Sequence, residues 1–176
     1  MPDFIKYFQE KVVFLPVLLP ENHVFDFNQQ FEEYFLETPF EGTINALHFK
    51  TDNPKGAIVY FHGNSDNLQR WGKIAGDFTQ FGYDILVMDY RSFGKSKGIR
   101  NEDNLNSDAQ FFYDFAKEKY GEGNLIVYGR SLGGAFALKI GAENEPKLII
   151  LEATFYNLQD IVNRWLPEKV TDKVSP

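Results

Sequence analysis

The stretch Leu125-Ile126-Val127-Tyr128-Gly129-Arg130-Ser131-Leu132-Gly133-Gly134-Ala135 decides the fold of this chain. An apolar run typical of a buried strand meets Gly-Arg-Ser-Leu-Gly and continues into small residues that favour a helix. This pattern predicts a strand, a sharp turn and a helix, with Ser131 in a strained conformation at the turn. Only small side chains fit two residues before and two residues after such a serine, and the sequence supplies Gly129 and Gly133 there.

Composition indicates a single globular unit. The chain has 176 residues, of which 43% are hydrophobic and 16% aromatic, so we expect one domain over residues 1–176 with a substantial core. A net charge of −7 makes nucleic acid and anionic lipid surfaces poor partners and favours a small-molecule substrate. The absence of cysteine excludes disulfides, thiolate metal sites and a cysteine nucleophile.

The N-terminal region carries no pattern typical of a membrane or secreted protein. Its apolar run from Val12 to Leu19 is interrupted by Pro16 and is too short to cross a bilayer. Acidic Asp3 and Glu10 occupy the place where a signal peptide has basic residues. We therefore expect no membrane span and a cytoplasmic location.

Strand and helix patterns alternate along the rest of the chain. An antiparallel pair at Phe31–Glu37 and Gly42–Lys50 is predicted from alternating apolar and polar residues. Continuous apolar runs predict buried strands, and helical spacing predicts the segments between them. The buried strands are Ala57–Phe61, Tyr83–Met88, Leu125–Tyr128 and Lys147–Leu151, and the helices are Leu68–Gly82, Leu105–Tyr120, Leu132–Glu143 and Leu158–Trp165.

This alternation defines the fold class. We predict an α/β fold, a three-layer αβα sandwich whose sheet is mostly parallel and doubly wound, with an antiparallel N-terminal edge. Residues 1–28 are expected to wrap one edge of the domain, with a short helical stretch around Phe4–Phe8.

In an open parallel sheet the site lies past the carboxyl ends of the strands. Three loops are predicted to meet there, at His62–Asn67, Asp89–Ser96 and the turn at Ser131. A serine at such a turn is a candidate nucleophile, and the oxyanion of an acyl-transfer intermediate needs two fixed donors. The backbone N–H groups of Asn64 and Leu132 are the candidate donors. No metal-ligand spacing or dinucleotide motif occurs, so we expect no metal and no cofactor.

Three segments together resemble the α/β-hydrolase superfamily, and most of all its small serine hydrolases related to the prolyl-oligopeptidase clan. The segments are Tyr60-Phe61-His62-Gly63-Asn64, Asp89-Tyr90-Arg91-Ser92-Phe93-Gly94-Lys95-Ser96 and Gly129-Arg130-Ser131-Leu132-Gly133-Gly134. The resemblance covers Phe31 to Leu166. It implies an α/β-hydrolase fold in which Ser131 is the nucleophile and Asn64 and Leu132 form the oxyanion hole. It also implies hydrolysis of carboxylic esters or related acyl substrates, as in esterases, thioesterases and lysophospholipases.

The catalytic histidine and acid of that family come after the serine, and here the sequence departs from the pattern. His23, His48 and His62 all precede Ser131; we expect His62 to hold its loop together and the other two to be surface or packing residues. Glu152 lies one strand too early for the family's acid. Two explanations stay open: a polypeptide truncated before two further βα units, or a shortened relative that covers the apolar edge strand Leu148–Leu151 by self-association.

Two functional classes follow. The first is a serine hydrolase that uses Ser131. The second is a non-catalytic hydrolase-like binding module, since loss of the histidine from such a triad lowers turnover by about 10⁶-fold. We favour the hydrolase for the intact protein, with the triad acid and histidine supplied from outside this chain, because a binding module gives no reason to keep a strained serine between two glycines. Asp89, Arg91 and Ser92 could shape substrate access, but we favour a role as hydrogen-bonded scaffold.

Overall fold

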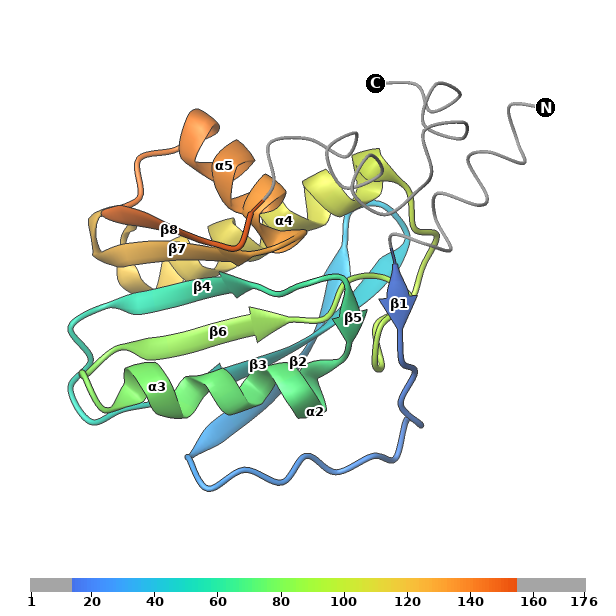
Figure 1. The fold of residues 1–176 in the computed structure, drawn as a ribbon, viewed down its shortest axis with the longest axis horizontal. Helices are drawn as coiled ribbons and strands as arrows, with labels where there is room; N and C mark the ends of the chain where they lie inside the picture. The colour runs from blue at the N-terminus through green and yellow to red at the C-terminus, as the bar shows by residue number, and fades with distance from the viewer. Residues whose placement is uncertain (1–13, 155–176) are drawn as a thin grey trace.

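A six-stranded sheet forms the centre of the computed structural model, which describes residues 14–154 (Figure 1). The strand order is β2-β3-β6-β4-β7-β8, with β1 and β5 forming a separate two-stranded pair. β4, β6, β7 and β8 run parallel, whereas β2 and β3 are antiparallel to their neighbours. The strands are β1 (Leu15–Pro16), β2 (Phe31–Thr38), β3 (Gly42–Phe49), β4 (Ala57–Phe61), β5 (Ser65–Asp66), β6 (Asp84–Met88), β7 (Leu125–Arg130) and β8 (Leu148–Glu152). The predicted parallel sheet with an antiparallel N-terminal edge is confirmed.

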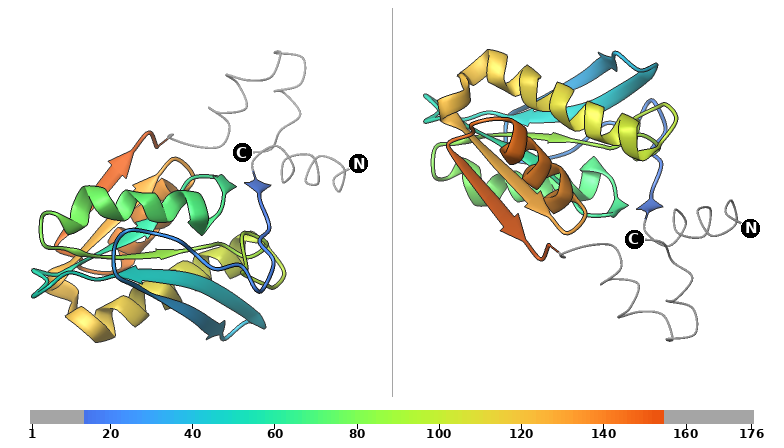
Figure 2. Two further views of the ribbon diagram at one scale, coloured as in Figure 1. Left: turned by 90° about the horizontal axis from the view of Figure 1, so that it is seen from below. Right: turned by 90° about the horizontal axis from the view of Figure 1, so that it is seen from above.

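Helices cover both faces of the sheet, as Figure 2 shows. α2 and α3 lie on one face, and α4 and α5 lie on the other. The helical segments are α2 (Leu68–Trp71), η1 (Gly72–Ile74), α3 (Ala75–Thr79), α4 (Glu102–Tyr120), η2 (Glu122–Asn124) and α5 (Gly133–Glu143). Within the described part of the chain, no helix combines the length and the apolar composition needed to cross a bilayer.

β4 shows why the central strands read as unbroken apolar runs. Successive side chains of a strand point to opposite faces, and both faces of this strand are covered. Val59 and Phe61 enter the core beneath α4 and α5, and Ile58 and Tyr60 enter the core beneath α2 and α3. Each of these four side chains is buried. Alternation is therefore lost from the sequence, as expected of a doubly covered parallel strand.

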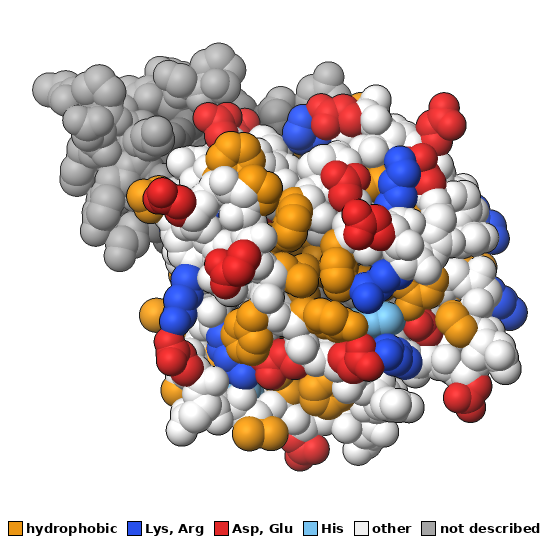
Figure 3. Space-filling view, turned by 180° about the vertical axis from the view of Figure 1, so that it is seen from behind, with side chains coloured by type: hydrophobic (Ala, Val, Ile, Leu, Met, Phe, Trp, Pro, Cys, Tyr) orange, Lys and Arg blue, Asp and Glu red, His pale blue; other side chains and the backbone are white. Residues whose placement is uncertain are grey.

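Partly buried hydrophobic side chains of β2 and α4 extend the core beneath α4 and α5. Tyr34 and Leu36 on β2 and Phe111 and Phe115 on α4 are half-buried and pack against the core. The Tyr34 and Phe115 rings meet edge to face at 5.3 Å. Figure 3, from behind the view of Figure 1, shows hydrophobic side chains gathered in a hollow that charged side chains border.

The single helix predicted for Leu68–Gly82 is wrong. The segment divides into α2, the 3₁₀ turn η1 and α3, and ends at Thr79. The division falls at Gly72, where an added Cβ would lie 2.6 Å from Cζ of Phe27 and 3.0 Å from Cζ of Phe49. Two rings from distant segments pack against the backbone there, so the helix tightens locally although its apolar spacing is regular.

The N-terminal segment runs along one end of the sheet in the described residues. β1 pairs in parallel with β5, beyond the carboxyl ends of β4 and β6 (Figure 1). Further along, Phe25 and Phe27 pack in the core beneath α2 and α3. Backbone hydrogen bonds from Leu15 and Val17 to the loop after β4 hold residues 14–19 in this position. The predicted helices at Phe4–Phe8 and Leu158–Trp165 lie outside the described residues.

β8 is an outer strand of the sheet in the described part of the chain. It pairs with β7 along one side, from Ile126–Leu148 to Arg130–Glu152. Leu148 and Leu151 are 51% and 44% exposed. The predicted position of this apolar strand at the sheet edge is therefore confirmed.

Candidate active site

Ser131 lies at the turn between β7 and α5, with a φ of 51° that few non-glycine residues adopt. Glycine is needed at positions 129 and 133, because other backbone atoms come very close to both residues. A Cβ at Gly129 would lie 2.4 Å from the carbonyl oxygen of Gly133, and a Cβ at Gly133 would lie 1.9 Å from the carbonyl oxygen of Phe61. Both obstacles are backbone atoms that cannot rotate away. The turn thus holds Ser131 between the central strands and the helix, half-exposed at the carboxyl end of the sheet.

The loop from His62 to Asn67, which we call the β4–α2 loop, lies beside Ser131. A Cβ built on Gly63 would be 3.8 Å from Cβ of Ser131. On the other side of the serine, the Leu132 N–H has no acceptor among residues 14–154 and sits at the N-terminal end of α5, where the helix dipole is positive. The structure therefore brings together the two loops that were expected to supply oxyanion donors.

His62 and Asp89 form a fully buried pair behind the β4–α2 loop. Nε2 of His62 is 3.2 Å from Oδ1 of Asp89, and Nδ1 is 2.7 Å from the carbonyl oxygen of Gly63. The other carboxylate oxygen of Asp89 accepts from Leu68 N at 3.1 Å, and Tyr90 Oη donates to the carbonyl oxygen of His62 at 2.7 Å. Burial raises the pKa of Asp89, and the contact with His62 opposes that rise. Nδ1 of His62 thus serves the loop directly, whereas Nε2 lies against Asp89, which follows β6.

The Glu152 carboxylate is held at the ends of β7 and β8. Tyr128 Oη donates to Oε2 at 2.5 Å, and Arg130 Nη1 lies 3.2 Å from Oε1. Burial raises the pKa of Tyr128 to about 12, with the Glu152 hydrogen bond adding to the effect. Backbone atoms connect the same residue to the turn, since Ser131 N donates to the carbonyl oxygen of Glu152 at 2.9 Å. The carboxylate is therefore engaged by two neighbours on the strands.

Arg91 is buried at the carboxyl end of β6 and binds Asp108 of α4 through two hydrogen bonds. Nε donates to Oδ2 at 2.7 Å and Nη2 to Oδ1 at 2.9 Å. Nη2 also donates to Thr38 Oγ1 and Nη1 to the carbonyl oxygen of Phe40, both at 2.8 Å. The hydrogen bonds to Asp108 raise the pKa of Arg91. This arrangement favours the scaffold interpretation for Arg91.

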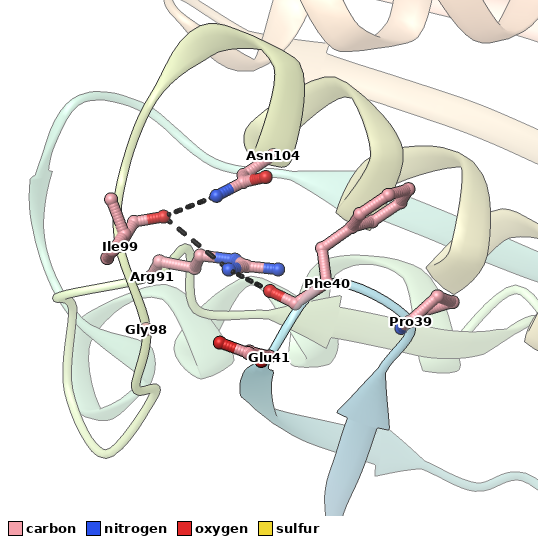
Figure 4. A pocket seen from close by; sticks show the side chains of 7 residues that line it. All are labelled: Pro39, Phe40, Glu41, Arg91, Gly98, Ile99 and Asn104. Atoms are coloured by element: carbon pink, nitrogen blue, oxygen red, sulfur yellow. Dashed lines mark hydrogen bonds between the residues drawn. The ribbon is translucent and has the colours of Figure 1, made fainter.

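A cavity of about 530 Å³ opens beside Arg91 (Figure 4). It lies between the β2–β3 turn and the start of α4, and none of Ser131, Asn64 and Leu132 lines it. Arg91 and Asn104 both donate to the carbonyl oxygen of Ile99 at its wall. The Arg91 and Asn104 side chains at the wall are thus engaged by the protein itself. The lining residues are Pro39, Phe40, Glu41, Arg91, Gly98, Ile99 and Asn104.

The remaining histidines lie away from Ser131. His48 is buried next to Asp84 and Tyr120, at 3.1 and 2.6 Å from Nε2. His23 Nε2 is 2.9 Å from Oε1 of Gln69. Among residues 14–154, no histidine is hydrogen-bonded to Ser131, and no group of three or more His, Asp or Glu is arranged to hold a metal ion.

A mostly parallel sheet between helices, with a strained serine at the turn from β7 to α5, defines an α/β-hydrolase fold. Solved structures agree: an alpha-beta hydrolase from Vibrio vulnificus superposes with a TM-score of 0.70 at 18% identity, covering 81% of this chain and 53% of the other. An esterase from Pyrococcus furiosus gives a TM-score of 0.66 at 20% identity, covering 91% and 65%. The profile of one family, serine aminopeptidase S33, matches residues 52–176. The chain belongs to that family.

Curated relatives extend the comparison. Protein bem46 of Schizosaccharomyces pombe is 29% identical over 150 residues, which are 81% of this chain and 50% of bem46. Lysophosphatidylserine lipase ABHD12 of Danio rerio is 30% identical over 137 residues, which are 68% of this chain and 35% of the lipase. The chain thus spans half or less of the length of both relatives.

Proposed function

We propose that this chain carries the nucleophile and the oxyanion hole of a serine hydrolase that acts on carboxylic esters or related acyl substrates. The observation that carries the proposal is the conformation of Ser131, a positive-φ serine held between close-packed glycines. Such strain persists only where the surroundings impose it, and it is concentrated at active sites. The names of the relatives, an esterase and a lysophosphatidylserine lipase, support the acyl-ester class.

In the proposed reaction Ser131 Oγ attacks the substrate carbonyl, and the oxyanion that forms accepts hydrogen bonds from the N–H groups of Asn64 and Leu132. The dipole of α5 adds to the stabilisation at Leu132. A general base takes the proton of Ser131 Oγ, and collapse of the intermediate breaks the bond to the leaving group, which departs as the alcohol with that proton. Water then attacks the acyl-enzyme, the bond to Ser131 Oγ breaks, and the acid is released as the serine recovers its proton. His62 does not act as the base, because its ring nitrogens face Gly63 and Asp89.

A second candidate is the non-catalytic hydrolase-like binding module. The observation that favours it is that, within residues 14–154, no histidine is hydrogen-bonded to Ser131. Attack by a serine hydroxyl needs a general base to accept its proton. An experiment on the chain must therefore provide that base.

Labelling with a fluorophosphonate separates the two candidates. The labelling rate of the chain is measured by intact mass, with and without imidazole as an added base, alongside Ser131→Ala and Ser92→Ala. Ser92 is a matched control because it too is a strand-end serine with a positive φ, of 68°. The hydrolase proposal expects a single label, accelerated by imidazole, that Ser131→Ala abolishes and Ser92→Ala leaves intact. An unreactive chain, or a label that survives Ser131→Ala, favours the binding module.

A further inference from the structure

The backbone carbonyl groups of the β4–α2 loop have partners outside the loop. The carbonyl oxygen of Asn64 accepts from Leu15 N at 2.8 Å, and that of Asp66 accepts from Val17 N at 3.3 Å. Between them, the carbonyl oxygen of Ser65 accepts from Trp71 Nε1 at 2.6 Å. Two of these three acceptors are therefore satisfied by the N-terminal segment Leu15–Leu19, which we call the strap.

The strap also binds the loop that follows β6. The carbonyl oxygen of Val17 accepts both from Asn67 Nδ2 and from Gly94 N, each at 3.1 Å, and Leu19 N donates to the carbonyl oxygen of Gly94 at 2.9 Å. One carbonyl group thus joins two strand-end loops that are distant in sequence. Asn67 in turn caps α2, because its Oδ1 accepts from Gln69 N at 2.9 Å.

The loop contains a residue in a strained backbone conformation. Asp66 has a φ of 71°, a conformation that costs a non-glycine residue on the order of 1–3 kcal/mol and persists only when the surroundings fix it. The strap meets the loop at this residue, with Pro16 opposite Asp66 in the β1–β5 register. The strap adds its backbone hydrogen bonds to the contacts that Trp71 and Arg70 make with the same segment, at Ser65 and Asp66.

We propose that the strap is a positioning element of the oxyanion hole, setting the orientation of the peptide groups at Asn64 from outside the hydrolase core. This inference rests on the proposed function for its catalytic consequence. Its structural part does not, because the hydrogen bonds from Leu15 and Val17 to the β4–α2 loop exist whether or not Ser131 reacts. An oxyanion donor displaced by about 1 Å lowers the rate by about 10²-fold, so a loose loop should be visible in kinetics.

Proline substitutions within the strap provide matched variants. Leu15→Pro and Val17→Pro each remove an N–H that donates to the loop. Leu18→Pro is the control, because it removes a backbone N–H that has no acceptor among residues 14–154. The side chain of Leu18 is exposed, as is that of Leu15. Using two test positions keeps the comparison informative if one variant does not fold.

Two readouts are measured on each variant, amide hydrogen exchange of peptides covering residues 62–68 and the rate of Ser131 labelling in imidazole. We expect Leu15→Pro and Val17→Pro to exchange about tenfold faster in these peptides and to label about 10²-fold more slowly, with Leu18→Pro unchanged in both. Equal exchange and labelling in all three variants would overturn the proposal, as would a lower melting temperature with unchanged labelling. Absence of Ser131-dependent labelling in the unmodified chain would overturn the proposed function, and the exchange comparison would still decide whether the strap holds the loop.

Discussion

Removing the charge of Asp108 should destabilise this protein more than any change to a surface ion pair. Arg91 and Asp108 have side chains that are 0% and 1% exposed, so the guanidinium of Arg91 cannot recover hydration when its partner is neutralised. Asp108→Asn keeps the shape of the side chain and removes the charge. Breaking a buried pair in this way costs about 3–5 kcal/mol, a large part of the total stability of about 5–15 kcal/mol typical of a domain.

The loss can be measured as a free energy by urea unfolding and as a change in melting temperature by thermal unfolding, both followed by tryptophan fluorescence. With about 2–4 °C in melting temperature per kcal/mol for a chain of this size, we expect a decrease of about 6–20 °C. Glu143→Gln is the surface control, because its pair with Lys139 is exposed; it should cost less than about 1 kcal/mol. The double variant Arg91→Met/Asp108→Leu should recover part of the stability, since no unpaired charge is left. A cost below about 1 kcal/mol for Asp108→Asn would refute the reasoning.

Three further outcomes are expected. Gly133→Ala should lower the free energy of unfolding by more than about 2 kcal/mol, because its Cβ would meet a backbone carbonyl at 1.9 Å. Gly123→Ala should be neutral, because a Cβ there would have nothing within 4 Å. Equal urea midpoints for the two variants would contradict this prediction. Burial lowers the pKa of His48 below 6.5, so the unfolded chain takes up the proton first and the free energy of unfolding falls as the pH drops below 6.5. His48→Gln should reduce this dependence of the free energy of unfolding on pH between about pH 7.5 and about pH 5.5. An unchanged pH dependence would exclude the effect. Self-association through β8 is expected to appear in sedimentation velocity and to disappear in Leu148→Lys/Leu151→Lys; a monomer at all concentrations would argue against it.

The turn at Ser131 could be predicted because its causes are local. Gly129 and Gly133 are needed for contacts within a few residues of the serine and with the neighbouring strand, and both appear as letters in the sequence. The same holds for the buried strands, since apolar runs such as Ala57–Phe61 are visible without knowledge of their neighbours. The meeting of the β4–α2 loop with the turn then follows from the parallel topology.

What could not be predicted depends on partners distant in sequence. The strap binds Asn64 through backbone groups that nearly every residue carries, so no side-chain pattern marks it. The division of the helix at Gly72 depends on where Phe27 lies, and helical spacing is the same with or without that ring. The pairing of Arg91 with Asp108 joins two common residue types whose separation in sequence indicates nothing by itself.

The strap has a practical consequence for handling the protein. Residues 15–19 contribute no strand to the six-stranded sheet, so proteolytic trimming up to residue 19 would remove the hydrogen bonds to both strand-end loops while leaving that sheet whole. Such a trimmed sample would keep its circular dichroism spectrum and run normally on a sizing column. Loss of activity in such a sample would then result from the missing N-terminal residues. The intact mass should therefore be measured before the reactivity of Ser131 is interpreted.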